Sequence, residues 1–385
     1  MAVDAWGFDS ERQAKAHRLR RMRFRLSIVR SAAIIVLVVG LVAVGSASLR
    51  DAVASFRWPS WASTILFLVL LFLIFLAVEL PFAYVGGHRW ETTSGLSSQS
   101  FRGWAKDLAK SVGLGLGGSI VVGSVVLWLL SATPAWWWLV AWVLGVLVSA
   151  ILGFLAPVLL VPLFYRFRPL ADAALRRRFE ALAAKAKVPI LGVFELRASE
   201  KTRRSNAAVM GLGPTRRVIV TDTLVTGFTP EEVETVLAHE LAHQKYRDPI
   251  RGFVSGSLVS LLILFAVSWV YASTYTIVGI RSVADMAGLP FLVAVFSILA
   301  LPFRPLELRA SRSREARADR FSLALTGDPA NFIAAMVKLH DLNLGVADPR
   351  PWEKWLFYSH PTGRDRVEMA RAFRPPIGGA RGESL

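Results

Sequence analysis

The chain has 385 residues, of which 54% are hydrophobic, and its formal net charge is +17. Its mean hydropathy of +0.46 excludes an ordinary soluble domain, and the absence of cysteine excludes a disulfide framework and thiolate chemistry. Because the Lys and Arg residues lie beside long uncharged stretches, the positive charge indicates an anionic membrane surface as the partner, and not nucleic acid.

Residues 1–30 are rich in arginine and predict a basic cytoplasmic tail that is solvated and partly helical. The uncharged stretch at residues 31–49 is long enough to cross a bilayer. Ser46-Ala47-Ser48 resembles a signal-peptide cleavage site, but the lengths of the stretch and of its positive flank favour a retained span. Five more spans are predicted at residues 58–78, on either side of Pro134 within 111–165, at 252–280 and at 286–303.

These spans divide the rest of the chain into a four-span membrane region (31–165), a soluble part (166–251), a transmembrane hairpin (252–303) and a second soluble part (304–385). The first soluble part is predicted to contain a helix at 170–187, strands at 194–196 and 218–220, and a turn at 211–214. The segments between spans are alternately basic and weakly charged. Both soluble parts are basic, so we expect them in the cytoplasm, at the inner membrane.

The strongest chemical motif is His-Glu-x-x-His, at His239, Glu240 and His243. Residues four apart lie on one face of a helix, so both imidazoles point at one place and form half of a zinc site. Glu240 lies beside them and can take a proton from a water molecule that the metal activates.

The helix that carries this motif has clear boundary signals. Thr229 and Glu232 predict a capping box at its start, and Asp248-Pro249 predicts its end. The alternative is an ordinary amphipathic helix with incidental histidines, whose buried face is Val233, Val236, Leu237 and Leu241.

A zinc site of this kind needs a third protein ligand, and Glu315 is the candidate. Asp319 lies one helical turn later and can accept the hydrogen bond that fixes the tautomer of a ligating histidine. The alternative is a charged, solvated helix with ion pairs along its surface. Because two predicted spans separate His243 from Glu315, the transmembrane hairpin would deliver the third ligand.

Three more polar residues are candidates for work at this site. His360 can donate a hydrogen bond to the oxyanion that develops in peptide hydrolysis, although a turn-capping histidine fits the local sequence equally well. Asn206 can bind substrate backbone as part of an edge strand, or it is a simple turn asparagine. His340 is expected on the surface of a helix.

Several further patterns occur in a characteristic order. S-R-x-x-E-x-x-A-D spans residues 311–319, S-N-A spans 205–207, and D-T-L spans 222–224. S-H-P with a following arginine stands at Ser359, His360, Pro361 and Arg366. With matches in the amino-terminal half, these patterns resemble the CAAX prenyl protease 1 family of integral-membrane zinc metallopeptidases over roughly residues 60 to 375.

The resemblance implies roles for the residues at these positions. One Zn²⁺ per chain would be bound by His239, His243 and Glu315. Glu240 would be the general base, His360 a transition-state donor and Asn206 a substrate-binding residue, with Asp319 and Arg366 supporting the ligands. The expected fold is a mainly α-helical polytopic membrane protein with six spans (seven is usual in the family) and a small zincin-like α+β metalloprotease domain at the cytoplasmic side.

The expected function is that of a membrane endopeptidase for peptide or protein substrates, lipidated or not, in contact with membrane lipid. The Arg- and Ala-rich composition suggests a bacterium, so a prenylated peptide is expected as a substrate in vitro more than in the cell. One alternative is a quality-control protease of the HtpX type, against which four spans before the zinc helix argue. The other is a non-catalytic scaffold or transporter with a relic metal site.

Overall fold

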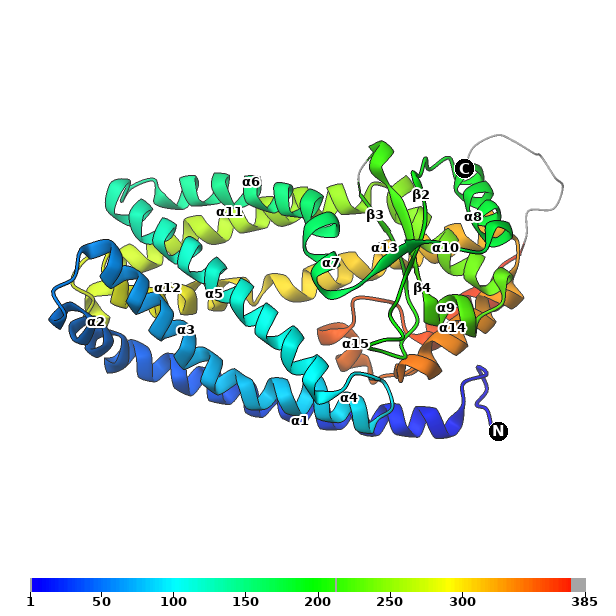
Figure 1. Ribbon diagram of the computed structural model, residues 1–385, viewed down its shortest axis with the longest axis horizontal. Helices are drawn as coiled ribbons and strands as arrows, with labels where there is room; N and C mark the ends of the chain where they lie inside the picture. Colours follow the sequence, from blue (N-terminus) through cyan, green and yellow to red (C-terminus); the bar gives the residue numbers. More distant parts are fainter. Residues whose placement is uncertain (1, 212, 375–385) are drawn as a thin grey trace. The chain divides into compact units, whose positions relative to one another are not determined.

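The computed structural model describes residues 2–211 and 213–374 and resolves the chain into two compact units (Figure 1). The sheet unit consists of Met1–Arg20, Pro157–Arg251 and Pro305–Leu385. The membrane unit consists of Arg21–Ala156 and Gly252–Arg304.

Helices dominate both units. Those of the amino-terminal half are α1 (Ser10–Gly40), α2 (Ser46–Ser55), α3 (Ser60–Tyr84), α4 (Trp90–Thr93), α5 (Phe101–Ala132), α6 (Trp137–Leu159), α7 (Val161–Phe164) and α8 (Ala173–Lys185). Those that follow are α9 (Asp222–Gly227), α10 (Pro230–Lys245), α11 (Asp248–Thr274), α12 (Leu289–Ala300), α13 (Phe303–Thr326), α14 (Pro329–Asn343), α15 (Pro351–Phe357) and α16 (Gly363–Ala372).

Among the described residues, five helical stretches are long and apolar enough to cross a membrane, at Ser10–Ser55, Ser60–Thr93, Phe101–Ala132, Trp137–Pro157 and Asp248–Val278. The pair Met286–Ala300 and Phe303–Thr326 makes a sixth if it counts as one span. The prediction of a mainly α-helical, polytopic membrane protein is therefore confirmed.

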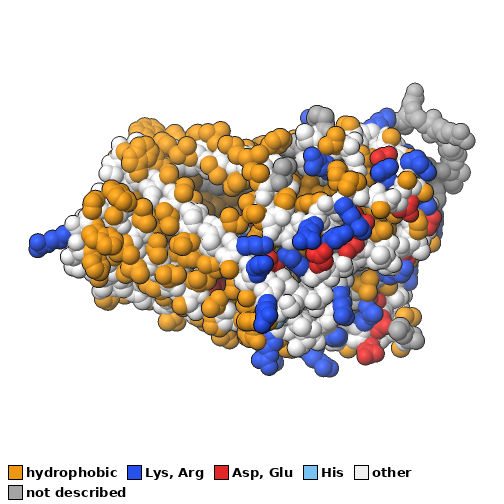
Figure 2. All heavy atoms as spheres, in the orientation of Figure 1, with side chains coloured by type: hydrophobic (Ala, Val, Ile, Leu, Met, Phe, Trp, Pro, Cys, Tyr) orange, Lys and Arg blue, Asp and Glu red, His pale blue; other side chains and the backbone are white. Residues whose placement is uncertain are grey.

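The membrane unit keeps many large apolar side chains on its outside, as expected where lipid and not water is the solvent. Val36, Trp128 and Ile151 are each more than half exposed, and Figure 2 shows hydrophobic side chains spread over the helices of this unit. Inside the unit, α3 and α5 approach closely at Gly123, where a Cβ atom would lie 2.6 Å from Leu68 Cδ2. A small residue at such a contact lets two membrane helices pack backbone to backbone.

The sheet unit contains a four-stranded sheet in the order β1-β2-β4-β3. The strands are β1 (Phe167–Pro169), β2 (Gly192–Leu196), β3 (Ala207–Met210) and β4 (Arg217–Thr221). The predicted strands lie within β2 and β4, which pair in parallel. The antiparallel edge strand β1 was not predicted, and β3 was anticipated only as the edge strand offered for Asn206, without bounds. The predicted turn at 211–214 includes Leu212, which lies outside the described residues.

The motif helix α10 begins with the predicted capping box at Thr229, but it ends at Lys245 and not at Asp248-Pro249. Arg247 has a φ of +56°, in the left-handed region, and turns the chain into α11 at Asp248. The prediction was wrong because Pro249 lies in the first turn of the next helix, where its missing N–H costs nothing.

The amino-terminal segment is not a solvated tail, contrary to the prediction. Phe8, Ala16 and Leu19 are at most 3% exposed, and residues up to Arg20 belong to the sheet unit. Helix α1 continues without a break from this segment into the first span. The prediction was wrong because it followed the many arginines and did not consider the few apolar positions that are buried within the sheet unit.

Candidate metal centre and substrate pocket

The two motif histidines lie on one face of α10, as the i, i+4 spacing requires. The Nε2 atoms of His239 and His243 are 3.2 Å apart, and the ring centroids are 4.9 Å apart. Helix α13 brings the Glu315 carboxylate to the same point, 3.1 Å from His239 Nε2 and 3.5 Å from His243 Nε2. One ligand atom from each of the three residues lies within 4.8 Å of the other two.

A carboxylate–arginine pair stands behind His239. The Nδ1 atom of His239 lies 2.8 Å from Asp319 Oδ1, and Arg366 donates to both oxygens of the same carboxylate. Burial alone would raise the pKa of Asp319, but Arg366 and His239 outweigh it and lower that pKa to about 2. Asp319 is therefore a charged acceptor that keeps hydrogen on Nδ1 and leaves Nε2 free to bind a metal.

A second pair of the same kind stands behind His243, and sequence reasoning missed it. His243 Nδ1 lies 3.0 Å from Asp248 Oδ2, while Arg317 donates to Asp248 Oδ1. The Arg317 guanidinium also lies 4.4 Å from the centroid of the Tyr246 ring. The sequence does contain a signal for this pair, because an acidic residue stands five positions after His243. From the sequence, Asp248 was interpreted only as part of the end of the helix.

These contacts test whether the cluster fits a metal ion. Both Nδ1 atoms face carboxylates and must donate, so both Nε2 atoms present lone pairs to each other and to the Glu315 carboxylate. Such a convergence of lone pairs is repulsive unless a proton or a metal cation lies within it. Burial alone would lower the pKa of His239, but hydrogen bonds to Asp319 and Glu315 raise it to about 9, so without a metal the added proton lies on Nε2 and a bound cation would take its place. Two imidazoles and one carboxylate form a donor set suited to zinc.

Asp248→Asn should weaken zinc binding about tenfold, because residues that hold the far nitrogen of a ligating histidine typically matter by 10- to 100-fold. Zinc affinity can be measured by competition with a fluorescent chelator. Glu234→Gln is the control, because Glu234 is likewise an acid paired with an arginine, Arg178, although it is less buried than Asp248. Equal zinc affinity in the Asp248 variant and the control would contradict the role of Asp248.

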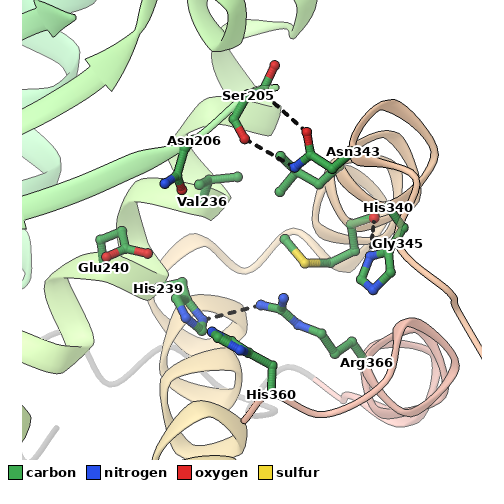
Figure 3. A pocket seen from close by; sticks show the side chains of 12 residues that line it. Ser205, Asn206, Val236, His239, Glu240, His340, Asn343, Gly345, His360 and Arg366 are labelled. Atoms are coloured by element: carbon green, nitrogen blue, oxygen red, sulfur yellow. Dashed lines mark hydrogen bonds between the residues drawn. The ribbon is translucent and has the colours of Figure 1, made fainter. Parts of the chain in front are cut away.

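A cavity of about 280 Å³ lies beside the metal cluster, which consists of the side chains of His239, His243 and Glu315 (Figure 3). Its apolar lining is Val236, Met336 and Leu339, and its polar lining is Ser205, Asn206, His239, Glu240, His340, Asn343, His360 and Arg366, with Gly345. Burial raises the pKa of the Glu240 carboxyl, which makes it a better proton acceptor than an ordinary glutamate.

His360 approaches the cluster through its Nε2 atom, which lies 3.4 Å from Glu315 Oε2. Its Nδ1 atom is 2.8 Å from Ser359 Oγ. The preceding segment is held by Arg312, which donates to the carbonyl oxygens of Lys354 and Tyr358. The arginine of the S-R-x-x-E pattern thus links the helix of Glu315 to the loop of His360.

Asn206 precedes the edge strand β3 and lines the cavity. The adjacent Ser205 is fixed by Asn343, whose side chain accepts from the Ser205 N–H at 3.2 Å and donates to the Ser205 carbonyl at 3.3 Å (Figure 3). Asn343 was not singled out from the sequence, because nothing local connects it with a strand 138 positions away.

His340 is half-buried in the cavity wall, so the expectation of a surface residue was wrong. Burial and the nearby Arg366 guanidinium lower its pKa from 6.5 to about 4. Between these two pH values the unfolded chain binds a proton at His340 that the folded chain does not. The contribution of His340 to the free energy of unfolding is therefore fully present above about pH 6.5 and is lost on acidification.

Acidification from pH 7 to pH 5 should therefore lower the melting temperature of the wild type more than that of a His340→Gln variant. The difference arises because glutamine has no proton to gain on unfolding. Thermal unfolding in detergent across this pH range checks it. Parallel pH dependence of the two proteins would show that His340 does not make this contribution.

Comparisons with known proteins agree with a metallopeptidase site formed by His239, His243 and Glu315. The family model Peptidase family M48 matches residues 169–374, and the model described as CAAX prenyl protease N-terminal, five membrane helices, matches residues 6–166. Within residues 6–166, all of which the structure describes, four helical stretches are long and apolar enough to span.

Two relatives match most of the chain. An uncharacterized metalloprotease, YhfN of Bacillus subtilis, is 29% identical over 324 residues, covering 83% of this chain and 75% of the relative. CAAX prenyl protease 1 of Saccharomyces cerevisiae is 28% identical over 344 residues, with the same two coverages. The crystal structure of S. mikatae Ste24p matches with a TM-score of 0.85 and 22% identity, covering 95% of this chain and 90% of that one, which shows a shared fold.

Proposed function

The chain belongs to peptidase family M48, and from this premise we propose that it is a zinc-dependent membrane endopeptidase. Its resemblance to CAAX prenyl protease 1, predicted from sequence motifs, is confirmed, and it is an integral membrane metallopeptidase similar to that enzyme. The observation that carries the zinc assignment is the convergence of two imidazole Nε2 atoms and one carboxylate on a single point beside Glu240.

His239, His243 and Glu315 would hold the zinc ion. Zinc bound there would polarise the scissile carbonyl and lower the pKa of the attacking water to about 7. Glu240 accepts the proton that this water loses as its oxygen bonds to the carbonyl carbon, and delivers it to the leaving amine as the C–N bond breaks. His360 donates from Nε2 to the carbonyl oxygen while negative charge develops on it.

The substrate backbone would lie along the edge strand β3, with Asn206 binding a peptide group next to the scissile bond. An edge strand offers unpaired N–H and C=O groups to an extended peptide. Asn343 holds Ser205, so the backbone next to Asn206 is fixed before substrate arrives. The apolar lining of the cavity would take a substrate side chain.

We place the metal centre on the cytoplasmic side of a bacterial inner membrane. The segments outside the spans that carry most Lys and Arg include both soluble parts. Four candidate spans precede α10 in the chain. An even number of crossings returns the chain to the side from which it started, which agrees with the presence of the amino-terminal segment and α10 in the same unit.

A quality-control protease of the HtpX type remains the second candidate for the physiological role. The match of residues 6–166 to the amino-terminal region of CAAX prenyl proteases favours the first candidate. A relic metal site is disfavoured because the three candidate ligands and the adjacent Glu240 are all present, and both histidines contact a supporting carboxylate.

The test is hydrolysis of a farnesylated CAAX-type peptide by purified protein in detergent, beside the same peptide without the prenyl group. Cleavage that a zinc chelator abolishes and added zinc restores is expected. Faster cleavage of the prenylated peptide would establish prenyl recognition. Cleavage of neither peptide by zinc-loaded protein would refute the prenyl-protease assignment and direct the search to unfolded membrane proteins.

A further inference from the structure

The amino-terminal segment, residues 2–20, is docked into the sheet unit by both apolar and polar contacts. Phe8 is fully buried against Ala347 and Val367. The backbone N–H of Asp9 donates to Asp341 Oδ2 at 2.9 Å. The contacts join residues more than 330 positions apart, so the segment is an integral part of the sheet unit and not an appendage.

This segment reaches the wall of the substrate cavity at two points. The first is Phe8, whose ring meets the His340 ring edge-on with centroids 5.6 Å apart. Gly363, at the start of α16, makes room for both rings, because a Cβ atom there would lie 2.8 Å from Phe8 Cζ and 3.0 Å from His340 Cδ2. Because His340 lines the cavity, Phe8 limits how far this imidazole can move away from a substrate.

The second point is Gln13, whose side-chain amide makes three hydrogen bonds with the end of α14 and the loop that follows it. Its Nε2 donates to Asp341 Oδ1 at 3.0 Å and to the Gly345 carbonyl at 3.2 Å. Its Oε1 accepts from the Ala347 N–H at 3.0 Å. Gly345 lines the cavity, so Gln13 fixes that part of the wall from behind.

The loop that Gln13 holds is locally strained. Leu344 has a φ of +50°, in the left-handed region that costs a non-glycine residue about 1 kcal/mol or more. Such a conformation persists only where surrounding contacts determine it. Gln13 forms hydrogen bonds with Gly345 and Ala347, which follow Leu344 in the chain. It therefore supplies such contacts from outside the loop.

We infer that Phe8 and Gln13 are specificity-determining residues of the peptidase, because they set the position of the cavity wall formed by His340 and Gly345. The inference rests on the proposed endopeptidase function. Neither side chain touches the metal cluster in the contacts above, so both act through the wall. The substrate class concerned is a peptide with an apolar side chain next to the scissile bond, since Val236, Met336 and Leu339 are the apolar lining of the cavity.

The experiment uses the full chain in detergent and quenched-fluorescent peptides that carry Ala, Leu or Trp at the two positions flanking the cleaved bond. Gln13→Leu keeps the side-chain volume but removes three hydrogen bonds. Phe8→Ala removes the ring, and Phe8→Leu restores most of its volume. Lys15→Ala, at an exposed position of the same helix, is the matched control.

Gln13→Leu and Phe8→Ala should each change the ratio of kcat/KM for Trp over Ala peptides by about fivefold or more, within the range that pocket fit produces. The change should arise in KM more than in kcat, with zinc affinity unchanged. Phe8→Leu should return toward the wild-type ratio, and Lys15→Ala should keep it.

Two results would overturn the inference. One is an equal loss of kcat/KM for every peptide, which would indicate a purely structural role for the segment. The other is an unchanged Trp-to-Ala ratio in both variants. Either result, with normal cleavage by the wild type, would refute this inference alone, whereas the absence of any wild-type cleavage would refute the endopeptidase function on which it rests.

Discussion

Glu240→Gln is expected to keep one zinc ion per chain while kcat/KM for peptide hydrolysis falls about 10³-fold, near the middle of the range for loss of a general base. Glutamine has nearly the shape of glutamate but cannot accept the proton of the attacking water. Its neighbours His239 and His243 keep their contacts to Asp319 and Asp248, so the ligands stay in place. Elemental analysis and peptide kinetics on one preparation measure both properties.

The matched control for this substitution is Glu231→Gln, in the first turn of the same helix, where the carboxylate pairs with Arg178. It should retain both zinc and activity. Metal-free Glu240→Gln protein would show that Glu240 helps to hold the ion. Near-normal turnover would show that another group takes the proton.

The sequence predicted the parts of this site that depend on local rules. The capping box at Thr229 and the spacing of His239 and His243 are properties of one helix, and they hold wherever that helix lies. Hydropathy likewise predicted the spans, because lipid requires continuous apolar helices. Glu315 needed the family resemblance as well, since its own helix also fits a simple charged surface.

The parts that were missed depend on contacts between distant segments. Asp248 contacts His243 after a turn in which Arg247 adopts a left-handed conformation. That conformation cannot be predicted from the sequence, because arginine rarely adopts it. The bounds of the edge strand β3 could not be predicted, because it has only four residues and no alternation of apolar and polar positions long enough to define them. His340 was expected in solvent because its covering residue, Phe8, lies at the other end of the chain.

The amino-terminal segment illustrates how charge can hide a packing surface. Its arginines predict solvation, yet the buried positions Phe8, Ala16 and Leu19 are enough to attach it to the sheet unit. Polar contacts from Asp9 and Gln13 then fix its register. None of these polar partners could be chosen from sequence alone, because each lies at least 328 positions away.

Glu315→Gln should weaken zinc binding by more than about 100-fold, because a ligand matters at least as much as the residues that support it. The substitution removes the only negative charge among the three proposed ligands, so only the two imidazoles would face the ion. Peptidase activity should fall with metal content. Glu307→Gln, at an exposed position of the same helix α13, should bind zinc as the wild type does.

The same substitution separates metal binding from folding. A ligand at 100 times its Kd stabilises the folded state by about 2.7 kcal/mol, so zinc should raise the melting temperature of the wild type and of Glu307→Gln. It should not raise that of Glu315→Gln at the same concentration, while all three proteins should melt alike in chelator. Equal zinc stabilisation of Glu315→Gln would exclude Glu315 as a ligand. A large loss of stability in chelator would instead mean that Glu315 serves the fold, as a buried acid between α10 and α13.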